Sequence, residues 1–233
     1  MKYFTFVVFF VHCALIFAQE ENRFNEREIV KQQKERSEKY AKELPNSIIL
    51  FRLETKAKEI EYYRKYDNLK AANSLEVKTR RDNQIIINAV RASFDICPVY
   101  FFDGASSQNV MNEKWQNVVF FSDSLTKDST FSLDSTTQFF IAEYSITKGQ
   151  YVSSNRNNEQ GSQETQSSSN EIKYYENNTI RVRGFVLFDR KFVPLTQPFP
   201  YYMKLNSLSR TVVVNEKIEK WNKKIKDYIS VTN

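Results

Sequence analysis

The spacing of apolar residues changes once along this chain, close to Ile96, and this change constrains the fold more than any other feature of the sequence. Before it, apolar residues recur every three or four positions, which is typical of one buried helix face. After it, short apolar runs rich in aromatic and β-branched residues predict buried strands. The sequence therefore predicts an α+β protein, with a helical segment over 19–95 and an α+β domain over 96–233.

The helical segment divides at Pro45. Residues 20–44 are rich in Glu, Lys, Arg and Gln and favour a solvated helix that ends before this proline. A second helix, capped by Asn46 or Ser47, is expected to bury one face. That face would carry Ile49, Leu53, Ala57, Ile60 and Tyr63. With a last helical piece at about 76–94, the segment forms a helical hairpin or a long bent helix.

The α+β domain is expected to hold a mixed sheet of about five strands flanked by helices. Strands are predicted over 97–102, 118–121, 139–146 and 179–189, with a hairpin after the last of these. In 179–189 apolar residues alternate with Arg181 and Arg183, which predicts one packed and one wet sheet face. The chain closes with an amphipathic helix whose apolar face would carry Ile218, Trp221, Ile225, Tyr228 and Ile229.

Residues 149–171 consist almost entirely of Ser, Asn, Gln, Glu and other residues with little apolar surface. Such a composition cannot offset the entropy lost on ordering. We therefore expect a disordered polar loop between two strands.

Residues 1–18 have the organisation of a secretory signal peptide. Lys2 forms a basic start, an apolar run extends from Tyr3 to Phe17, and Ala18 supplies the small residue at the cleavage point. An uncleaved anchor is the alternative, but the apolar run is shorter than the roughly 20 residues that a membrane-spanning helix needs. The sequence predicts export, cleavage after Ala18 and a soluble mature chain.

Several classes of chemistry lack their residues once the signal peptide is removed. The single histidine, His12, lies within it, and Cys97 is then the only cysteine, so no intramolecular disulfide can form. Because Cys97 lies in an apolar run, we expect it to be a core residue. The four glycines are too far apart to form a phosphate-binding loop. We expect no cofactor and no metal site, although a Ser-Lys dyad remains open.

Two carboxylates are the candidate catalytic residues, because Asp103 and Asp123 directly follow two predicted strands. Two such acids can cleave a glycosidic bond when one is protonated and the other ionised, and they can also bind calcium. Asp103 is followed by Gly104, however, and Asp123 lies between two serines, which is also ordinary turn chemistry.

Aromatic pairs offer a second kind of candidate surface. Exposed rings at Tyr62-Tyr63, Tyr174-Tyr175 or Phe199-Pro200-Tyr201-Tyr202 would stack on sugars or bases, whereas core packing explains the same residues. The formal net charge of +6 is modest, and no nucleic-acid-binding module is present in the sequence. We therefore expect no nucleic-acid partner.

Three stretches of the sequence form hydrophobic motifs. They are Ile16-Phe17-Ala18-Gln19-Glu20, then Ile87-Asn88-Ala89-Val90 with Phe94 and Cys97-Pro98-Val99-Tyr100-Phe101-Phe102, and later Pro198-Phe199-Pro200-Tyr201-Tyr202. The chain in this way resembles small exported proteins of Bacteroidetes that have no assigned function, over about residues 76–205. The resemblance implies the periplasm or cell surface of a Gram-negative bacterium. It implies no catalytic residue.

The sequence thus favours an exported, non-catalytic accessory or binding protein of the cell envelope, with a protein partner in the envelope. The helical arm and the wet face of the sheet are the expected partner surfaces. One alternative is a carboxylate-dependent enzyme acting on envelope glycans, with Asp103 and Asp123 as acid and base. Another is a protein that attaches peripherally to anionic membranes through its C-terminal helix.

Overall fold

A six-stranded mixed sheet forms the centre of the computed structural model, which describes residues 27–131, 133–134, 136–148 and 181–232. The strand order is β3-β2-β1-β4-β5-β6. The strands are β1 (Ile48–Leu53), β2 (Val99–Asp103), β3 (Phe120–Phe121), β4 (Phe139–Lys148), β5 (Arg181–Phe188) and β6 (Tyr202–Lys204). The predicted signal peptide and the predicted polar loop over 149–171 lie outside the described residues.

The three central strands are parallel and the outer strands are antiparallel additions. β1 pairs in parallel with β2 on one side and β4 on the other. β3 joins β2 antiparallel, and β5 and β6 extend the sheet antiparallel beyond β4. Parallel strands need a long crossover connection, which the helices between β1 and β2 supply.

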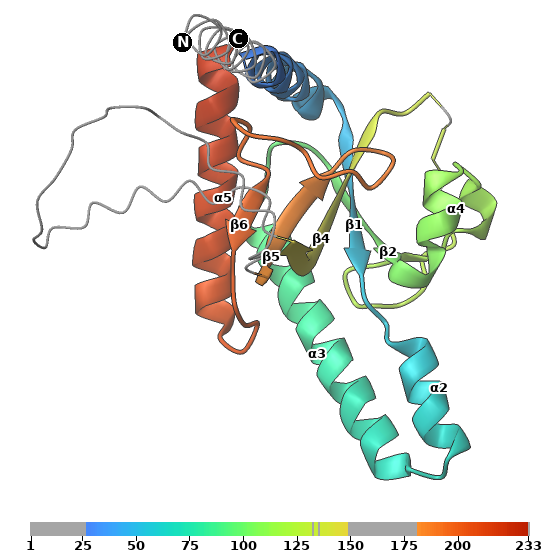
Figure 1. Ribbon diagram of the computed structural model, residues 1–233. Helices are drawn as coiled ribbons and strands as arrows, with labels where there is room; N and C mark the ends of the chain where they lie inside the picture. The colour runs from blue at the N-terminus through green and yellow to red at the C-terminus, as the bar shows by residue number, and fades with distance from the viewer. Residues whose placement is uncertain (1–26, 132, 135, 149–180, 233) are drawn as a thin grey trace, which may run out of the picture.

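Helices surround this sheet (Figure 1). The N-terminal helix covers residues 27–43 and is followed by η1 (Leu44–Asn46). The others are α2 (Ala57–Lys65), α3 (Leu69–Ser93), η2 (Gly104–Ser106), α4 (Ser107–Met111), η3 (Trp115–Asn117) and α5 (Thr211–Thr232). The α+β fold predicted from the sequence is confirmed, with a helical hairpin formed by α2 and α3 and a C-terminal helix, α5.

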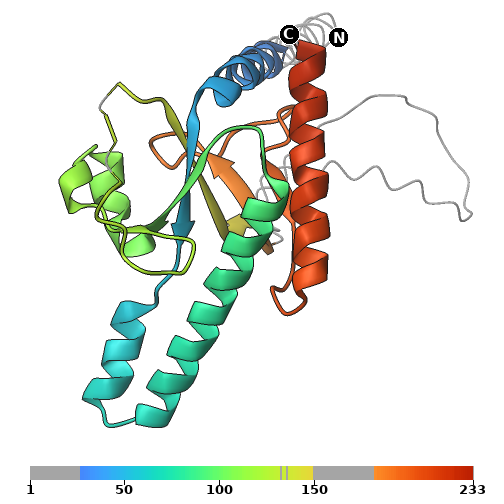
Figure 2. The same ribbon diagram turned by 180° about the vertical axis from the view of Figure 1, so that it is seen from behind.

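The sheet separates two hydrophobic clusters. The larger one joins alternate strand residues such as Phe51, Phe101 and Phe185 to α3, α5 and the N-terminal helix. Figure 2 shows α3 and α5 side by side on this face. The smaller cluster, on the other face, includes Leu50 of β1 and Val110 of α4. Both faces of the central strands are therefore buried, which explains their continuous apolar runs.

The prediction that a helix starts at Asn46 or Ser47 is wrong, because residues 48–53 form β1, a central strand of the sheet. Ile49 and Leu53 fit the i, i+4 spacing of a helix, but they also fit the alternation of a strand. Ser47 donates to the carbonyl oxygen of Leu44 at 2.8 Å and so closes η1 instead of capping a helix. The predicted helical segment 19–95 therefore contributes a strand to the same sheet as the rest of the chain.

The prediction that 179–189 exposes one face to solvent is also wrong over the second half of β5. Phe185 and Leu187 belong to the larger cluster, and Val186 and Phe188 belong to the smaller one. β5 is an interior strand between β4 and β6, so only Arg183 is exposed among its residues 183–188. A short sixth strand, β6, was not predicted.

The C-terminal helix behaves as expected for a helix that packs on a sheet. Val214, Ile218, Trp221 and Ile225 are buried, and the indole nitrogen of Trp221 donates to the carbonyl oxygen of Pro200 at 2.7 Å. In the described part of the chain, no helix combines the length and apolar character needed to cross a bilayer.

Candidate partner-binding surface

The α2–α3 hairpin forms an arm that extends beyond the sheet (Figures 1 and 2). The turn between its helices is set locally: Asp67 adopts a left-handed conformation with φ of 55°, and the Asn68 side chain accepts a hydrogen bond from the backbone of Ala71 at 3.2 Å. Asn68 therefore caps α3 at its first turn. An ion pair between Arg64 and Glu76, 2.6 Å apart, joins the two helices near this turn.

The base of the arm is fixed to the body. The Asn83 side chain, which is buried, donates to the carbonyl oxygen of Glu54 at 2.8 Å. Beyond it, the second half of α3 buries Ile86, Ile87 and Val90 in the larger cluster. The arm therefore starts from a rigid junction.

The outer part of the arm exposes large apolar side chains. The exposed fractions are 58% for Tyr62, 64% for Tyr66, 55% for Leu69 and 69% for Val77. The centroids of the Tyr62 and Tyr66 rings lie 4.7 Å apart with the ring planes tilted by 49°, at the end of α2. Aromatic and aliphatic side chains grouped on a projecting element are typical of a protein interaction site. Of the Tyr62-Tyr63 pair identified in the sequence, Tyr62 is exposed and Tyr63 is only partly accessible.

A shallow hollow lies on α3 within the arm. Its lining residues are Asn73, Ser74, Val77, Lys78 and Arg81. The sequence predicted the helical arm as a partner surface but did not single out these residues. Val77 is an apolar residue between Glu76 and Lys78, and in the structure its side chain is exposed.

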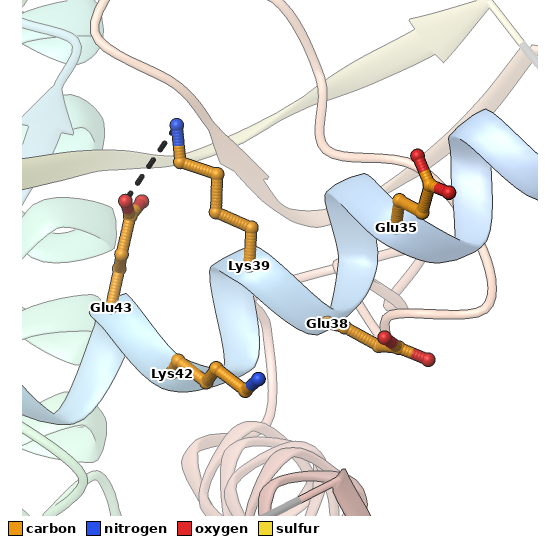
Figure 3. A pocket seen from close by; sticks show the side chains of 5 residues that line it. All are labelled: Glu35, Glu38, Lys39, Lys42 and Glu43. Atoms are coloured by element: carbon orange, nitrogen blue, oxygen red, sulfur yellow. Dashed lines mark ion pairs between the residues drawn. The ribbon is translucent and has the colours of Figure 1, made fainter.

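A second hollow lies along the N-terminal helix and is lined by Glu35, Glu38, Lys39, Lys42 and Glu43 (Figure 3). Three acidic and two basic side chains line it, and Lys39 pairs with Glu43 at 3.7 Å. Because most of these charges compensate one another, the hollow has only a weak net charge with which to attract a ligand.

Asp103 and Asp123 are not brought together. Asp103 ends β2, where its carboxylate accepts hydrogen bonds from the Thr55 hydroxyl at 2.9 Å and from the backbone of Ala105 at 3.0 Å. Asp123 follows β3, and both its oxygens accept from the Arg91 side chain at 2.9 and 3.0 Å.

The strand register explains this separation. β2 and β3 are antiparallel with Phe101 opposite Phe121, so Asp103 and Asp123 lie at opposite ends of the pair. Four residues of strand correspond to about 13 Å, beyond the roughly 5–9.5 Å of two-carboxylate glycosidases. Both side chains act in this structure as turn and ion-pair residues.

One charged pair lies at the carboxyl ends of the parallel strands, where sites occur in α/β sheets. Arg52 of β1 pairs with Glu143 of β4 at 2.7 Å, and the Arg52 Nε atom donates to the Ser107 hydroxyl at 2.9 Å. Sequence reasoning missed this pair, since the register that joins β1 to β4 is set by tertiary structure. The Arg52–Glu143 pair connects β1 and β4, and Ser107 links it to α4.

The remaining chemical candidates belong to the interior. Burial raises the pKa of the Cys97 thiol to about 12, with a smaller opposing effect of a hydrogen bond from Ser47, so the thiol stays protonated at neutral pH. Phe199 is fully buried and packs edge-on against Tyr40 and Tyr228. Within the described ranges, no group of three or more His, Cys, Asp or Glu side chains is placed to hold a metal ion. Tyr174-Tyr175 lie outside the described residues.

The apolar face of α5 is not available to a membrane in this structure, because Ile218, Trp221 and Ile225 are buried against the body. Comparisons with protein-family models, with curated proteins and with solved structures give no match to this chain. The functional argument therefore depends on the surfaces themselves, and the arm has the largest group of exposed apolar side chains among the described residues.

Proposed function

We propose that this protein is an exported, non-catalytic accessory protein of a Gram-negative cell envelope that binds a partner protein through the α2–α3 arm. The observation that supports this most is the exposure of large apolar side chains on the arm, with Tyr62, Tyr66 and Leu69 near the turn and Val77 on the outer side of α3. A helical hairpin that leaves the sheet costs conformational entropy and buries few of its own residues. A partner that covers these side chains offsets that cost.

A binding role is favoured over a catalytic one by the arrangement of the charged groups. The Asp103 carboxylate accepts hydrogen bonds from Thr55 and from the turn that follows β2, and Asp123 pairs with Arg91. The Arg52–Glu143 pair is likewise satisfied by its own members and Ser107. None of these groups is left with the free, convergent geometry that acid-base chemistry needs.

Export is the part of the proposal that depends on residues 1–18 and on the resemblance to exported proteins. Signal cleavage after Ala18 makes Gln19 the first residue of the mature protein. Amino-terminal sequencing of the protein from the periplasmic or surface fraction of its own host tests this. Recovery of the full-length chain, starting at Met1, from the cytoplasm contradicts export.

The partner-binding role is tested by photo-crosslinking in the native envelope. A photoreactive amino acid placed at Tyr62 is expected to crosslink reproducibly to one envelope protein, because the Tyr62 ring is exposed on the arm. The paired change Tyr62→Ser and Tyr66→Ser is expected to reduce recovery of that protein in a pull-down to background.

The matched control is the paired change Val193→Ser and Val231→Ser, which removes exposed apolar side chains from the body. It is expected to leave recovery unchanged. Equal recovery with the arm variant and the unaltered protein contradicts the proposal, as does capture of glycan alone.

A further inference from the structure

We infer that the outer face of α3 binds an acidic amphipathic helix of the partner protein. This inference rests on the proposed function and specifies the chemistry of its binding surface. The outer face is defined here by Lys70, Asn73, Ser74, Val77, Lys78 and Arg81, all of which are exposed.

The position of the outer face follows from helix geometry. Ala72 is fully buried, and Leu75 and Thr79, one and two turns further along, are half-buried, which places α2 on their side of α3. At 100° per residue, Asn73, Val77 and Arg81 lie on the opposite side. The face extends over about 16 Å from Lys70 to Arg81, the length of three helical turns.

The shape of the face suits another helix. Asn73, Val77 and Arg81 form one row of residues at four-residue spacing, and Lys70, Ser74 and Lys78 form the next. The shorter side chains of Asn73, Ser74 and Val77 leave the hollow between these rows. Rows of residues at this spacing form ridges and grooves into which the ridge of a second helix packs.

The charge of the face suits an acidic ligand. Lys70 and Lys78 form no ion pair with any residue that the structure describes, and Arg81 forms an ion pair with the adjacent Asp82, at 3.2 Å. Glu76, the acid closest in sequence to Lys78, is already paired with Arg64 of α2. A helix that carries Asp or Glu at four-residue spacing can therefore pair with Lys70, Lys78 and Arg81, and an apolar residue between them can cover Val77.

Other occupants fit this face less well. Val77 is its one apolar side chain, which is too little apolar surface for insertion into a lipid bilayer. A second copy of this chain carries a net positive charge, so its approach to a basic face is disfavoured. Charge complementarity thus selects an acidic segment of a different protein.

The experiment places a photoreactive amino acid at Val77 in the full chain, expressed in its own host, and identifies the crosslinked segment by mass spectrometry. We expect the crosslink to fall in a helical segment with at least two Asp or Glu residues within one turn of the attachment point. A synthetic peptide of that segment is then the probe for binding to the unaltered chain and its variants.

The paired change Lys78→Glu and Arg81→Glu is expected to weaken binding of this peptide by about tenfold or more, and raised salt is expected to weaken binding of the unaltered chain. The control is Lys58→Glu with Lys65→Glu, which changes the net charge equally on the other helix of the arm and is expected to have a small effect. Replacing the acids of the peptide by Lys is expected to restore binding to the Lys78→Glu, Arg81→Glu chain. Circular dichroism checks that both variants keep their helix content.

The outcomes separate this inference from the proposed function. A crosslink from Val77 to lipid, to glycan, to a second copy or to a segment without acids overturns the acidic-helix inference. So does a partner that crosslinks at Tyr62 but not at Val77, although the arm then remains a binding surface. The absence of a protein crosslink from both positions overturns both proposals.

Discussion

At the scale of single residues, Gly184 is a position where the sheet has no room for a side chain. A Cβ atom there would lie 2.2 Å from the backbone oxygen of Met203 in β6 and 2.9 Å from a ring carbon of Tyr202. We expect Gly184→Ala to lower the free energy of unfolding by about 3 kcal/mol, because two strands must separate to admit the methyl group. Chemical denaturation measures this. Gly104→Ala, which meets a backbone atom only at 3.0 Å, is expected to cost clearly less, and equal losses in the two variants contradict the explanation.

Cys97 predicts how stability depends on alkaline pH. Burial raises the pKa of its thiol to about 12, whereas a thiol in an unfolded chain ionises near pH 8.5. The unfolded state therefore loses this proton first, and the free energy of unfolding is expected to fall as the pH rises from about 8.5 towards 12. Tyr202, whose pKa burial also raises to about 12, adds to the fall above about pH 10. Denaturant midpoints measured across this range should fall less in Cys97→Ala between pH 8.5 and 10, and identical slopes there contradict this prediction.

At the scale of elements, α5 and β1 show what the spacing of apolar residues does and does not determine. α5 buries one face, and its three- and four-residue spacing predicted it. β1 buries both faces in six residues, so its apolar run has no periodicity that separates a strand from a short helix. β6 is three residues long, which is too short for any pattern, and it forms because Met203 and its neighbours pair with β5. The predicted fold class was therefore correct, although its central strand was predicted to be helical.

The pairing of β1 with β4 is stabilised by Arg52 and Glu143, whose side chains are 28% and 13% exposed. We expect Glu143→Leu to lower the free energy of unfolding by about 2 kcal/mol, because it leaves a half-buried guanidinium without its counter-ion. The double change Arg52→Leu and Glu143→Leu is expected to recover part of this loss, because no unpaired charge then remains. A double-mutant cycle by chemical denaturation measures the coupling. A coupling energy near zero contradicts a stabilising role for the pair.

At the scale of the whole molecule, the candidate surface was harder to predict than the fold. The sequence identified Tyr62 and the helical arm as candidates, because aromatic residues and helical spacing are visible in it. The exposure of Val77 depends on where β1 ends and on which half of α3 meets the sheet, and both are tertiary properties. For Asp103 and Asp123 the sequence left two interpretations open, a catalytic pair or ordinary turn residues, and the structure shows turn and ion-pair contacts. Both follow strands, but the strands are antiparallel, and two such ends lie far apart.

We expect the molecule to consist of a stable body and an arm that adds little to its stability, and this division can be measured. Between residues 57 and 79 only Ile60 and Ala72 are buried. Replacing residues 58–79 by four Gly and Ser residues is sterically feasible, because packed helix axes lie 8–10 Å apart and four extended residues span about 13 Å.

We expect the shortened protein to unfold within about 5 °C of the complete chain, as followed by circular dichroism, since the larger cluster and the Asn83 contact are retained. Ile87→Ala, in the half of α3 that packs on the sheet, is expected to cost about 2–5 kcal/mol and to lower the unfolding temperature further. A larger effect of the shortening than of Ile87→Ala means that the arm supports the body. A larger effect of Ile87→Ala than of the shortening means that the fold does not depend on the arm, which supports a role for the arm in partner binding.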